Sequence, residues 1–322
     1  MKFIFYDEVF TPSNYQKLIL CILTICESTR HHIMVLNEDG EEYQKFLCYL
    51  GDTSNLIRGI IKNDPREFIL EKSIIYNVKN EKTCFDSHII NIQELYLNLK
   101  KTFNLYLENS INDYLFILFY CTNAQKNFFE NCLNSHEFQI KNGGGIGTLK
   151  NMIENHNFDK DFSFVIFDSD NLPLQPHYVN PNTKLMEDAA IAKQAKFHKL
   201  NRRNIENYIP LSALKDMYKQ NHPVLKKINV LENLYTKSID FRKNFSVKEG
   251  LNKDLRASAS VPNYIDISST LSSEELLELN TGFGKNVAEE VFSLDLPDAL
   301  KKEDIDAWTE VNGIITRIQK LM

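Results

Sequence analysis

Two aspartates separated by one residue, Asp168 and Asp170, carry the clearest chemical signal in the sequence. They directly follow a strongly apolar run of strand length at residues 163–167, so we expect them at the carboxyl end of a buried strand. Alternate residues of an extended backbone point to the same face, which would let both carboxylates address one site. Such a pair suits Mg²⁺ or Mn²⁺, although the same tripeptide is also typical of a simple turn.

A basic stretch that ends in one acid follows. Residues 193–205 contain five lysines and arginines and no acidic residue, and Glu206 comes directly after them. We expect this carboxylate to serve a second metal position or to act as a general base. The basic side chains expected to contact phosphate are Lys199, Arg202 and Arg203, the arginines through their planar guanidinium groups. The alternative is a basic helix face on which Glu206 forms ordinary ion pairs.

The elements around these residues predict a parallel sheet. Apolar runs at 114–120 and 163–167 and a short segment at 138–140 are strand candidates, and 124–133 and 148–155 are helical. A glycine turn at 143–147 lies between the second strand and the second helix. Strands that alternate with helices in this way are typical of a parallel sheet. Ligands of such sheets bind beyond the carboxyl ends of the strands, where the two aspartates lie.

The whole chain is predicted to be an α/β protein in three regions. Residues 1–110 form a mixed N-terminal region, in which we expect helices at 15–26, 41–50 and 90–108 and a strand at 33–36. Residues 111–212 hold the parallel sheet flanked by helices. Residues 213–322 are mainly helical, with a helix start at Ser272, two late helices separated by Pro297, and a polar loop at 244–270.

Composition excludes several classes of protein. The 322 residues carry a net charge of −6, so a globally basic surface that coats nucleic acid is excluded, while a local basic patch is not. No run approaches the ~18 apolar residues that cross a bilayer, so we expect no membrane partner. Two acids near the start argue against a secretion signal. The six cysteines show no CxxC spacing, which argues against a zinc knuckle and favours reduced thiols in a cytoplasmic protein.

The motifs of the second region together resemble a known family. Asn142-Gly143-Gly144-Gly145, the helix TLKNMI, VIFDSD and LNRRNIENYI resemble the Toprim domain of the OLD-type (overcoming lysogenization defect) nucleases. The resemblance covers residues 114–212 and is closest to short Toprim effectors of bacterial anti-phage systems. It implies a Toprim-like sheet in which Asp168 and Asp170 bind Mg²⁺ or Mn²⁺. It also implies that Glu206 assists them and that Arg202 and Arg203 face phosphate.

One part of the family pattern is missing at its expected place. The first strand of the family ends in Glu-Gly-x-x-Asp, but Cys121 and Gln125 stand at the two acidic positions when 114–120 is taken as that strand. A thiol and an amide cannot replace two hard anions. Either the domain is catalytically silent, or another acid completes the site. Glu130 is one candidate. The others, Glu38 and Glu42, lie in a strand-turn-helix pattern at 33–46.

Two functions follow as expectations from this resemblance. One is a metal-dependent nuclease effector that acts on DNA or RNA in anti-phage defence. The other is a silent Toprim-like subunit that regulates or binds a partner of a defence system. Nucleic acid and an ATPase sensor or another defence protein are the partners that the resemblance implies. A second copy of the chain is a further candidate partner, with Trp308 in the C-terminal helix as a candidate contact.

Overall fold

The computed structural model describes residues 1–28, 31–61, 74–258 and 265–322. The chain divides into two compact units. The first contains residues 1–104, 123–139 and 316–322, and the second contains residues 105–122 and 140–315. The two units are described separately below. No helix in the described ranges has the length and apolar character that a bilayer crossing requires.

The first unit contains a four-stranded parallel sheet in the order β2-β1-β3-β4. Its strands are β1 (Lys2–Phe5), β2 (His32–Val35), β3 (Ile75–Lys79) and β4 (Ile89–Asn91). Its helices include α1 (Tyr15–Glu27), α2 (Glu41–Leu50), α3 (Ser54–Ile60), α5 (Ile92–Leu99) and α7 (Asn123–Asn134). The predicted strand at 33–36 and the helices at 15–26, 41–50 and 124–133 are therefore confirmed.

The carboxylate of Asp7 fixes the start of α2. Its two oxygens accept hydrogen bonds from the backbone N–H groups of Tyr43, at 3.0 Å, and Glu42, at 3.5 Å. These are donors of the first helical turn, which have no partner within the helix. Gly40 lies directly against Asp7, since a Cβ at this position would meet Asp7 Oδ1 at 2.1 Å. The close approach explains why glycine precedes α2.

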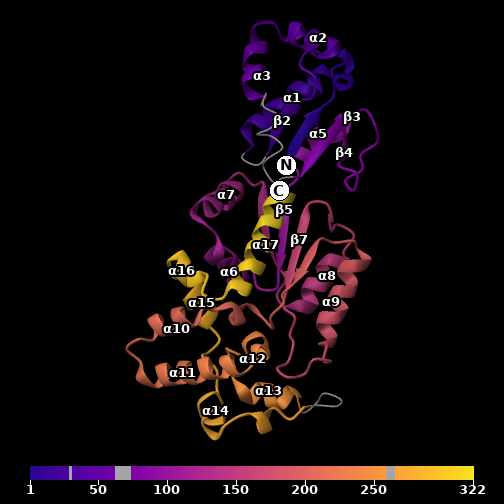
Figure 1. Cartoon of the computed structure of the whole chain (residues 1–322). Coiled ribbons are helices and arrows are strands. Elements are labelled where there is room, and N and C mark those ends of the chain that lie inside the picture. Colours follow the sequence, from indigo (N-terminus) through magenta and orange to yellow (C-terminus); the bar gives the residue numbers. More distant parts are fainter. Residues whose placement is uncertain (29–30, 62–73, 259–264) are drawn as a thin grey trace. The chain divides into compact units, whose positions relative to one another are not determined.

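A second four-stranded sheet has the order β6-β5-β7-β8. Its strands are β5 (Phe103–Leu107), β6 (Phe138–Asn142), β7 (Ser163–Phe167) and β8 (Phe197–Lys199). The helices α8 (Ile146–Glu154) and α9 (Pro181–Ala192) lie side by side next to this sheet (Figure 1). The predicted α/β class, with parallel sheets flanked by helices, is confirmed.

The packing of α8 and α9 against the second sheet explains the apolar positions of this region. A buried cluster joins side chains of β5, β7, α8 and α9: Tyr106, Leu149, Ile153, Val165, Phe167 and Met186. All five residues of β7 are buried, as expected for a strand of a parallel sheet that is covered on both faces. Because β7 is held by this packing, its end has a defined position, and so does the acidic segment that follows it.

The first strand of this sheet is not where the sequence pattern predicted it. Residues 114–120 lie in helix α6 (Asn112–Tyr120), and the predicted helix at 90–108 is divided between α5 and strand β5. A short, continuous apolar run fits a buried helix as well as a buried strand, so its periodicity could not decide between them. The strand that precedes α6 is therefore β5. It ends at Leu107 instead of Tyr120, and the residue that follows it is Glu108.

The C-terminal part of the chain is mainly helical, as predicted. Its helices are α10 (Leu211–Met217), α11 (His222–Lys237), α12 (Ile239–Asn244), α13 (Leu251–Ser258), α14 (Ser273–Glu278), α15 (Val287–Phe292), α16 (Asp298–Lys301) and α17 (Ile305–Leu321). Ser272 forms a capping box with Glu275, and Pro297 separates α15 from α16. The polar segment 244–270 was expected to be a loop, but it contains α13, while its residues 259–264 lie outside the described ranges.

Candidate functional site

Four carboxylates line one cavity in the second unit. The cavity has a volume of about 340 Å³, and its acidic wall consists of Glu108, Asp113, Asp168 and Glu206. Lys248 is the one lysine or arginine among its described lining residues. The five charged side chains come from four separate segments of the chain, and the fold of the second unit brings them together.

Glu108 and Asp168 follow two neighbouring strands, β5 and β7. The backbone N–H of Asp168 donates a hydrogen bond to Oε1 of Glu108 at 3.0 Å. Asp113 lies in the first turn of α6, and its Oδ2 accepts a hydrogen bond from the N–H of Asn109 at 2.9 Å. The turn between β5 and α6 therefore places two acids beside the acid that ends β7.

Asp170 does not share the face of Asp168. Its φ of 51° lies in the left-handed region, so the backbone leaves the extended conformation on which the prediction of a shared face depended. Its N–H donates to the carbonyl of Arg203 at 3.0 Å, and Ser169 Oγ donates to the carbonyl of Arg202 at 2.8 Å. The segment after β7 is thus tied to the segment before Glu206, while only Asp168 of the two aspartates lines the cavity.

Glu206 lies in a short 3₁₀ helix, η4 (Ile205–Tyr208), and only 5% of its surface is exposed. Its Oε1 lies 3.4 Å from Nζ of Lys248. Its Oε2 is buried and has no hydrogen-bond partner in the described structure. A buried carboxylate oxygen without a partner is energetically costly, and a bound cation or donor would relieve this cost.

Arg202 and Arg203 are buried, which corrects the expectation that they face phosphate. Arg202 pairs with Asp304, with 2.6 Å between Nη2 and Oδ2, and its guanidinium also donates to the carbonyl of Asn207 at 2.8 Å. Arg203 pairs with Asp254, which is fully buried in α13. Their donors are used inside the protein, so these arginines position η4 and Glu206 instead of meeting a ligand.

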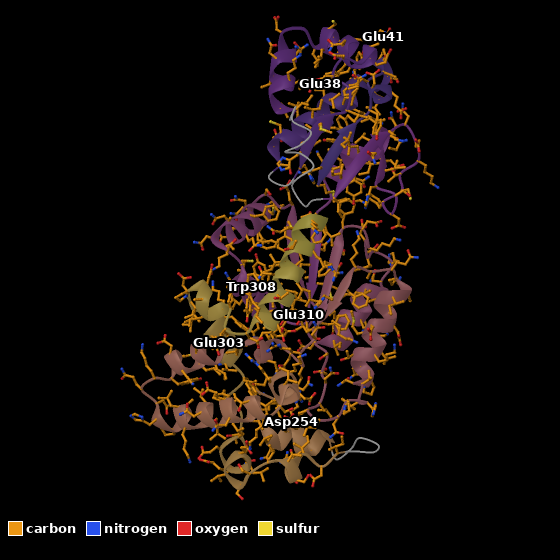
Figure 2. The ribbon with its side chains drawn as sticks, viewed as in Figure 1. Glu38, Glu41, Asp254, Glu303, Trp308 and Glu310 are labelled. Atoms are coloured by element: carbon orange, nitrogen blue, oxygen red, sulfur yellow. The ribbon has the colours of Figure 1, made fainter. Side chains whose placement is uncertain are left out.

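The segment around Glu206 has further buried anchors. Tyr208 donates from its hydroxyl to Glu310 Oε2 at 2.8 Å and accepts at its carbonyl from Tyr120 at 2.6 Å. Glu310, on α17, also contacts His198 Nε2 at 2.8 Å. Figure 2 labels Glu310 on α17 and Asp254 on the α13 ribbon. The LNRRNIENYI segment, on which the resemblance depended, therefore mainly holds Glu206 in position at the cavity.

The other basic and acidic candidates lie elsewhere in the structure. Lys199 pairs with Glu187 at 2.9 Å and is not part of the cavity wall. Glu38 and Glu42 follow β2 in the first unit, where Figure 2 labels Glu38, and the sheet that contains β2 does not contain β7. The alternative in which Glu38 and Glu42 complete the site through a shared sheet is therefore wrong. Glu130 lies on α7, also in the first unit.

Glu108, Asp113 and Lys248 were not among the residues predicted from the sequence. A signal for the first two was present, because FNLYL is a strand-like run that ends directly in an acid, and a second acid follows five residues later. The stronger apolar run at 114–120 concealed it. Cys121 and Gln125 stood at the two acidic positions of the family motif only because residues 114–120 were taken as the first strand. No local pattern indicated Lys248, which lies in a loop more than 40 residues after Glu206.

Burial and mutual repulsion disfavour the charged forms of these acids. Burial raises the pKa of Glu108 to about 7, and the Asp170 and Asp113 carboxylates add to the rise. Burial likewise raises the pKa of Asp113 to about 7, with Glu206 contributing. The pKa of Asp168 is raised well above its ordinary value by burial and then by Glu108. A divalent cation would reverse these shifts because it favours the ionised carboxylates.

The donor set fits a hard divalent cation in its chemistry, although a coordination group is not already assembled. Within the described ranges, no three histidine, cysteine, aspartate or glutamate side chains form a group that could hold a metal ion. The cavity offers carboxylate oxygens from three chain segments, which are the ligands that Mg²⁺ and Mn²⁺ prefer. Ligation therefore requires side-chain movements that bring these oxygens closer together.

Comparison of the chain with family models, with curated proteins and with solved structures finds no match. What the chain does is therefore inferred from the residues that line the cavity.

Proposed function

We propose that this protein is a metal-dependent hydrolase of phosphodiester bonds in nucleic acid. The observation that carries the proposal is the meeting of Glu108, Asp113, Asp168 and Glu206 at one cavity. Two of these acids, Glu108 and Asp113, follow the strand that pairs with β7, which is where the resemblance to OLD-type Toprim nucleases implies an acidic pair. They depart from the Glu-Gly-x-x-Asp pattern, since they lie five residues apart and Asn109 stands in place of the glycine. Cys121 and Gln125, which argued against catalysis, do not follow this strand but come after helix α6.

The electrostatics of the cavity support a cation as its natural partner. Burial raises the pKa of both Glu108 and Asp113 to about 7, so without a cation part of this wall is protonated near neutral pH. Glu206 Oε2 has no hydrogen-bond partner among the residues that the structure describes. Mg²⁺ or Mn²⁺, when bound, neutralises the acids and activates water for attack on a phosphodiester. Asp168, Glu206 and Glu108 are the residues that would hold it.

The remaining residues of the cavity have roles that follow from their charge. A carboxylate whose pKa lies near 7 can accept a proton and release it again at neutral pH, and Asp113, which is not among the residues that would hold the cation, has this property. The neighbouring carboxylates Glu206 and Asp168 raise the pKa of Lys248, although burial opposes this effect, so its ammonium stays charged. It can stabilise negative charge that develops on a phosphate oxygen.

The proposal also covers the substrate and the biological setting of the protein. The resemblance to short Toprim effectors favours DNA or RNA as the substrate and anti-phage defence as the setting, with an ATPase sensor or another defence protein as partner. The silent alternative is favoured by one observation, the absence of an assembled metal group among the described residues. The two functions differ in whether the cavity acids are needed for cleavage.

A nuclease assay with purified protein tests the proposal. DNA and RNA, including tRNA, are incubated with Mg²⁺, Mn²⁺ or EDTA. We expect cleavage that requires the metal and that Asp168→Asn and Glu206→Gln each reduce at least about 100-fold, the size typical of a lost catalytic group. The matched control is Asp216→Asn, which removes an exposed carboxylate of α10 that pairs with Lys219. Cleavage by Asp168→Asn at the wild-type rate would contradict the proposal.

A further inference from the structure

One positive charge in the cavity depends on the position of a loop. Lys248 lies in the loop between α12 and α13, its Nζ is 3.4 Å from Glu206 Oε1, and 35% of its side chain is exposed. It is the only lysine or arginine among the described residues that line the cavity. A lysine ammonium stands at the end of a flexible stem, so its charge has a defined place only if the backbone that carries it is fixed.

A second segment, residues 279–284, fixes this loop through main-chain hydrogen bonds. The bonds join it to residues 247–252, and each segment both donates and accepts, so neither can shift alone without losing them. The hydrogen bonds run from Phe283 N–H to the carbonyl of Val247 at 2.9 Å, from Gly284 to Lys248 at 3.1 Å, from Leu251 to Leu279 at 2.8 Å and from Asn252 to Asn280 at 3.2 Å. One of them therefore holds the carbonyl of Lys248 itself.

Two glycines allow these segments to approach closely. A Cβ at Gly282 would lie 2.3 Å from the carbonyl carbon of Lys248 and 2.4 Å from its oxygen. A Cβ at Gly250 would lie 2.4 Å from the carbonyl carbon of Thr281, and the φ of 84° at Gly250 also favours glycine. Both clashes involve main-chain atoms, which cannot turn aside as the end of a side chain can. The backbone of Lys248 is thus packed directly against another backbone.

A lysine of α11 holds the second segment in addition. Nζ of Lys227 donates to the carbonyls of Thr281 at 3.0 Å and Gly282 at 3.2 Å, and it is 3.2 Å from the hydroxyl of Thr281. The same ammonium lies 5.6 Å from the centre of the Phe283 ring, where a cation is attracted. Lys227 is not among the described residues that line the cavity. Its positive charge therefore acts on the segment that supports Lys248.

We propose that Gly250, Gly282 and Lys227 are positioning residues, which act by placing the Lys248 ammonium at the acidic wall. This inference rests on the proposed function, because it explains how that site places the charge that stabilises phosphate. A misplacement of about 1 Å can lower a rate about 100-fold. The helical C-terminal part thereby contributes to the site, although Lys248 is its only member among the described lining residues.

Gly282→Ala tests the contact between the two segments. The added Cβ displaces the backbone of Lys248, so we expect kcat to fall about 100-fold at a nearly unchanged KM, since the charge that Lys248 stabilises develops in the transition state. In the Lys248→Gln background the same substitution should lower kcat no further. Gly313→Ala in α17 is the matched control, because its Cβ meets nothing within 4 Å. Wild-type kcat in Gly282→Ala would overturn the proposal.

Two further measurements on Gly282→Ala require no cleavage. Mn²⁺ should bind more tightly than to the wild type, as expected for Lys248→Gln, because the ammonium repels the cation less. A general structural defect would weaken Mn²⁺ binding instead. Acetylation of Lys248 by acetic anhydride in EDTA, measured by mass spectrometry, should be faster because an ammonium displaced from Glu206 is more exposed. Wild-type acetylation together with wild-type Mn²⁺ affinity would contradict the displacement of Lys248.

Lys227→Met is the milder variant, and it keeps the proposal testable where Gly282→Ala does not fold. It removes the ammonium that holds two carbonyls of the second segment and adds no atom between the segments. Lys248 should be acetylated faster, and kcat should fall by less than in Gly282→Ala. Lys215→Met is the matched control, since Lys215 pairs with Glu232 at 2.7 Å. Equal acetylation of Lys248 in Lys227→Met and Lys215→Met would overturn the role of Lys227.

The two proposals can fail separately. Faster acetylation and tighter Mn²⁺ binding in Gly282→Ala, without cleavage of DNA or RNA by the wild type, would support the placement of Lys248 and contradict the proposed function. Metal-dependent cleavage that requires Asp168 and Lys248, but that proceeds at the wild-type kcat in Gly282→Ala and Lys227→Met, would support the proposed function and overturn this inference.

Discussion

The backbone N–H of Asp168 donates a hydrogen bond to the Oε1 of Glu108 at 3.0 Å. This bond connects the ends of two adjacent strands whose sequences lie 60 residues apart. It places Asp168, which the sequence pattern indicated, beside Glu108, which the pattern did not indicate. The interpretation of the cavity as a metal site depends on this neighbour relationship, because one aspartate at a strand end would be an ordinary turn residue.

Metal affinity should depend on the acids of the second unit and not on those of the first. Glu108→Gln and Asp168→Asn each remove a cavity carboxylate, so isothermal titration calorimetry should show Mn²⁺ binding weakened at least about tenfold, as expected for a lost charged ligand. Glu38→Gln is the control, since Glu38 belongs to the other unit. Equal loss of affinity in Glu38→Gln would refute the assignment of the site to the β5–β7 edge.

The stability of the metal-free protein should fall as the pH rises toward 8. Because burial raises the pKa of Glu108 and Asp113 to about 7, the folded protein binds more protons than the unfolded chain between about pH 4 and pH 7. The stabilising contribution is complete below the unfolded pKa and is lost through pH 7. Urea unfolding in EDTA should show a loss of up to about 5 kcal/mol from this pair between pH 5 and pH 8.

The double variant Glu108→Gln/Asp113→Asn is the check on that pH dependence. It removes two of the cavity carboxylates whose pKa is raised, so its unfolding free energy should vary less between pH 5 and pH 8 than that of the wild type. Mn²⁺ should restore stability to the wild type at pH 8, where the acids are ionised, and should have little effect at pH 5. A wild-type pH dependence in the double variant would assign the effect to other groups.

Removal of the Lys248 ammonium should separate metal binding from catalysis. Lys248→Gln removes a positive charge beside Glu206, so Mn²⁺ should bind more tightly, by up to about tenfold, because a repulsion is lost. Cleavage should nevertheless fall about 100-fold or more, since charge on the phosphate is no longer stabilised. Calorimetry and the nuclease assay measure the two effects. Weaker metal binding in Lys248→Gln would be inconsistent with the proposed position of the cation.

The pair of Arg203 and Asp254 should contribute to stability and not directly to phosphate binding. Arg203→Ala leaves Asp254 buried without its partner, which typically costs about 3–5 kcal/mol. Urea unfolding measures the loss. The double variant Arg203→Met/Asp254→Asn removes both charges, keeps an acceptor for the buried N–H of Ser246, and should recover part of the loss. No recovery in the double variant would show that Arg203 has a role beyond its buried pair.

The close contact of Gly40 with Asp7 should make this glycine sensitive to substitution. A Cβ at Gly40 would meet Asp7 Oδ1 at 2.1 Å, so Gly40→Ala should displace the cap of α2 and cost about 1–2 kcal/mol. Gly59→Ala in α3 is the matched control, because its Cβ meets nothing within 4 Å and alanine favours helix. Thermal unfolding compares the two, and equal stability of both variants would contradict the proposed cap.

The sequence by itself determined the local features of this protein. The run at 163–167 is so apolar that a buried strand was its natural structure, and the acids after it could only lie at the strand's end. The capping pattern at Ser272 likewise predicted a helix start that the structure confirms, whereas the amphipathic segment at 90–108 is helical only in α5. These features depend on neighbours in the chain, so their pattern is visible in a single sequence.

The tertiary structure alone decided which residues meet. The apolar run at 114–120 is compatible with strand and helix, and only packing against the rest of the second unit makes it α6, so that Glu108 ends the strand beside β7. Burial of Arg202 and Arg203 depends on partners that lie 102 and 51 residues away in the sequence, respectively. Long-range pairing of this kind leaves no periodic signal, and for this reason the cavity acids could be located only from the fold.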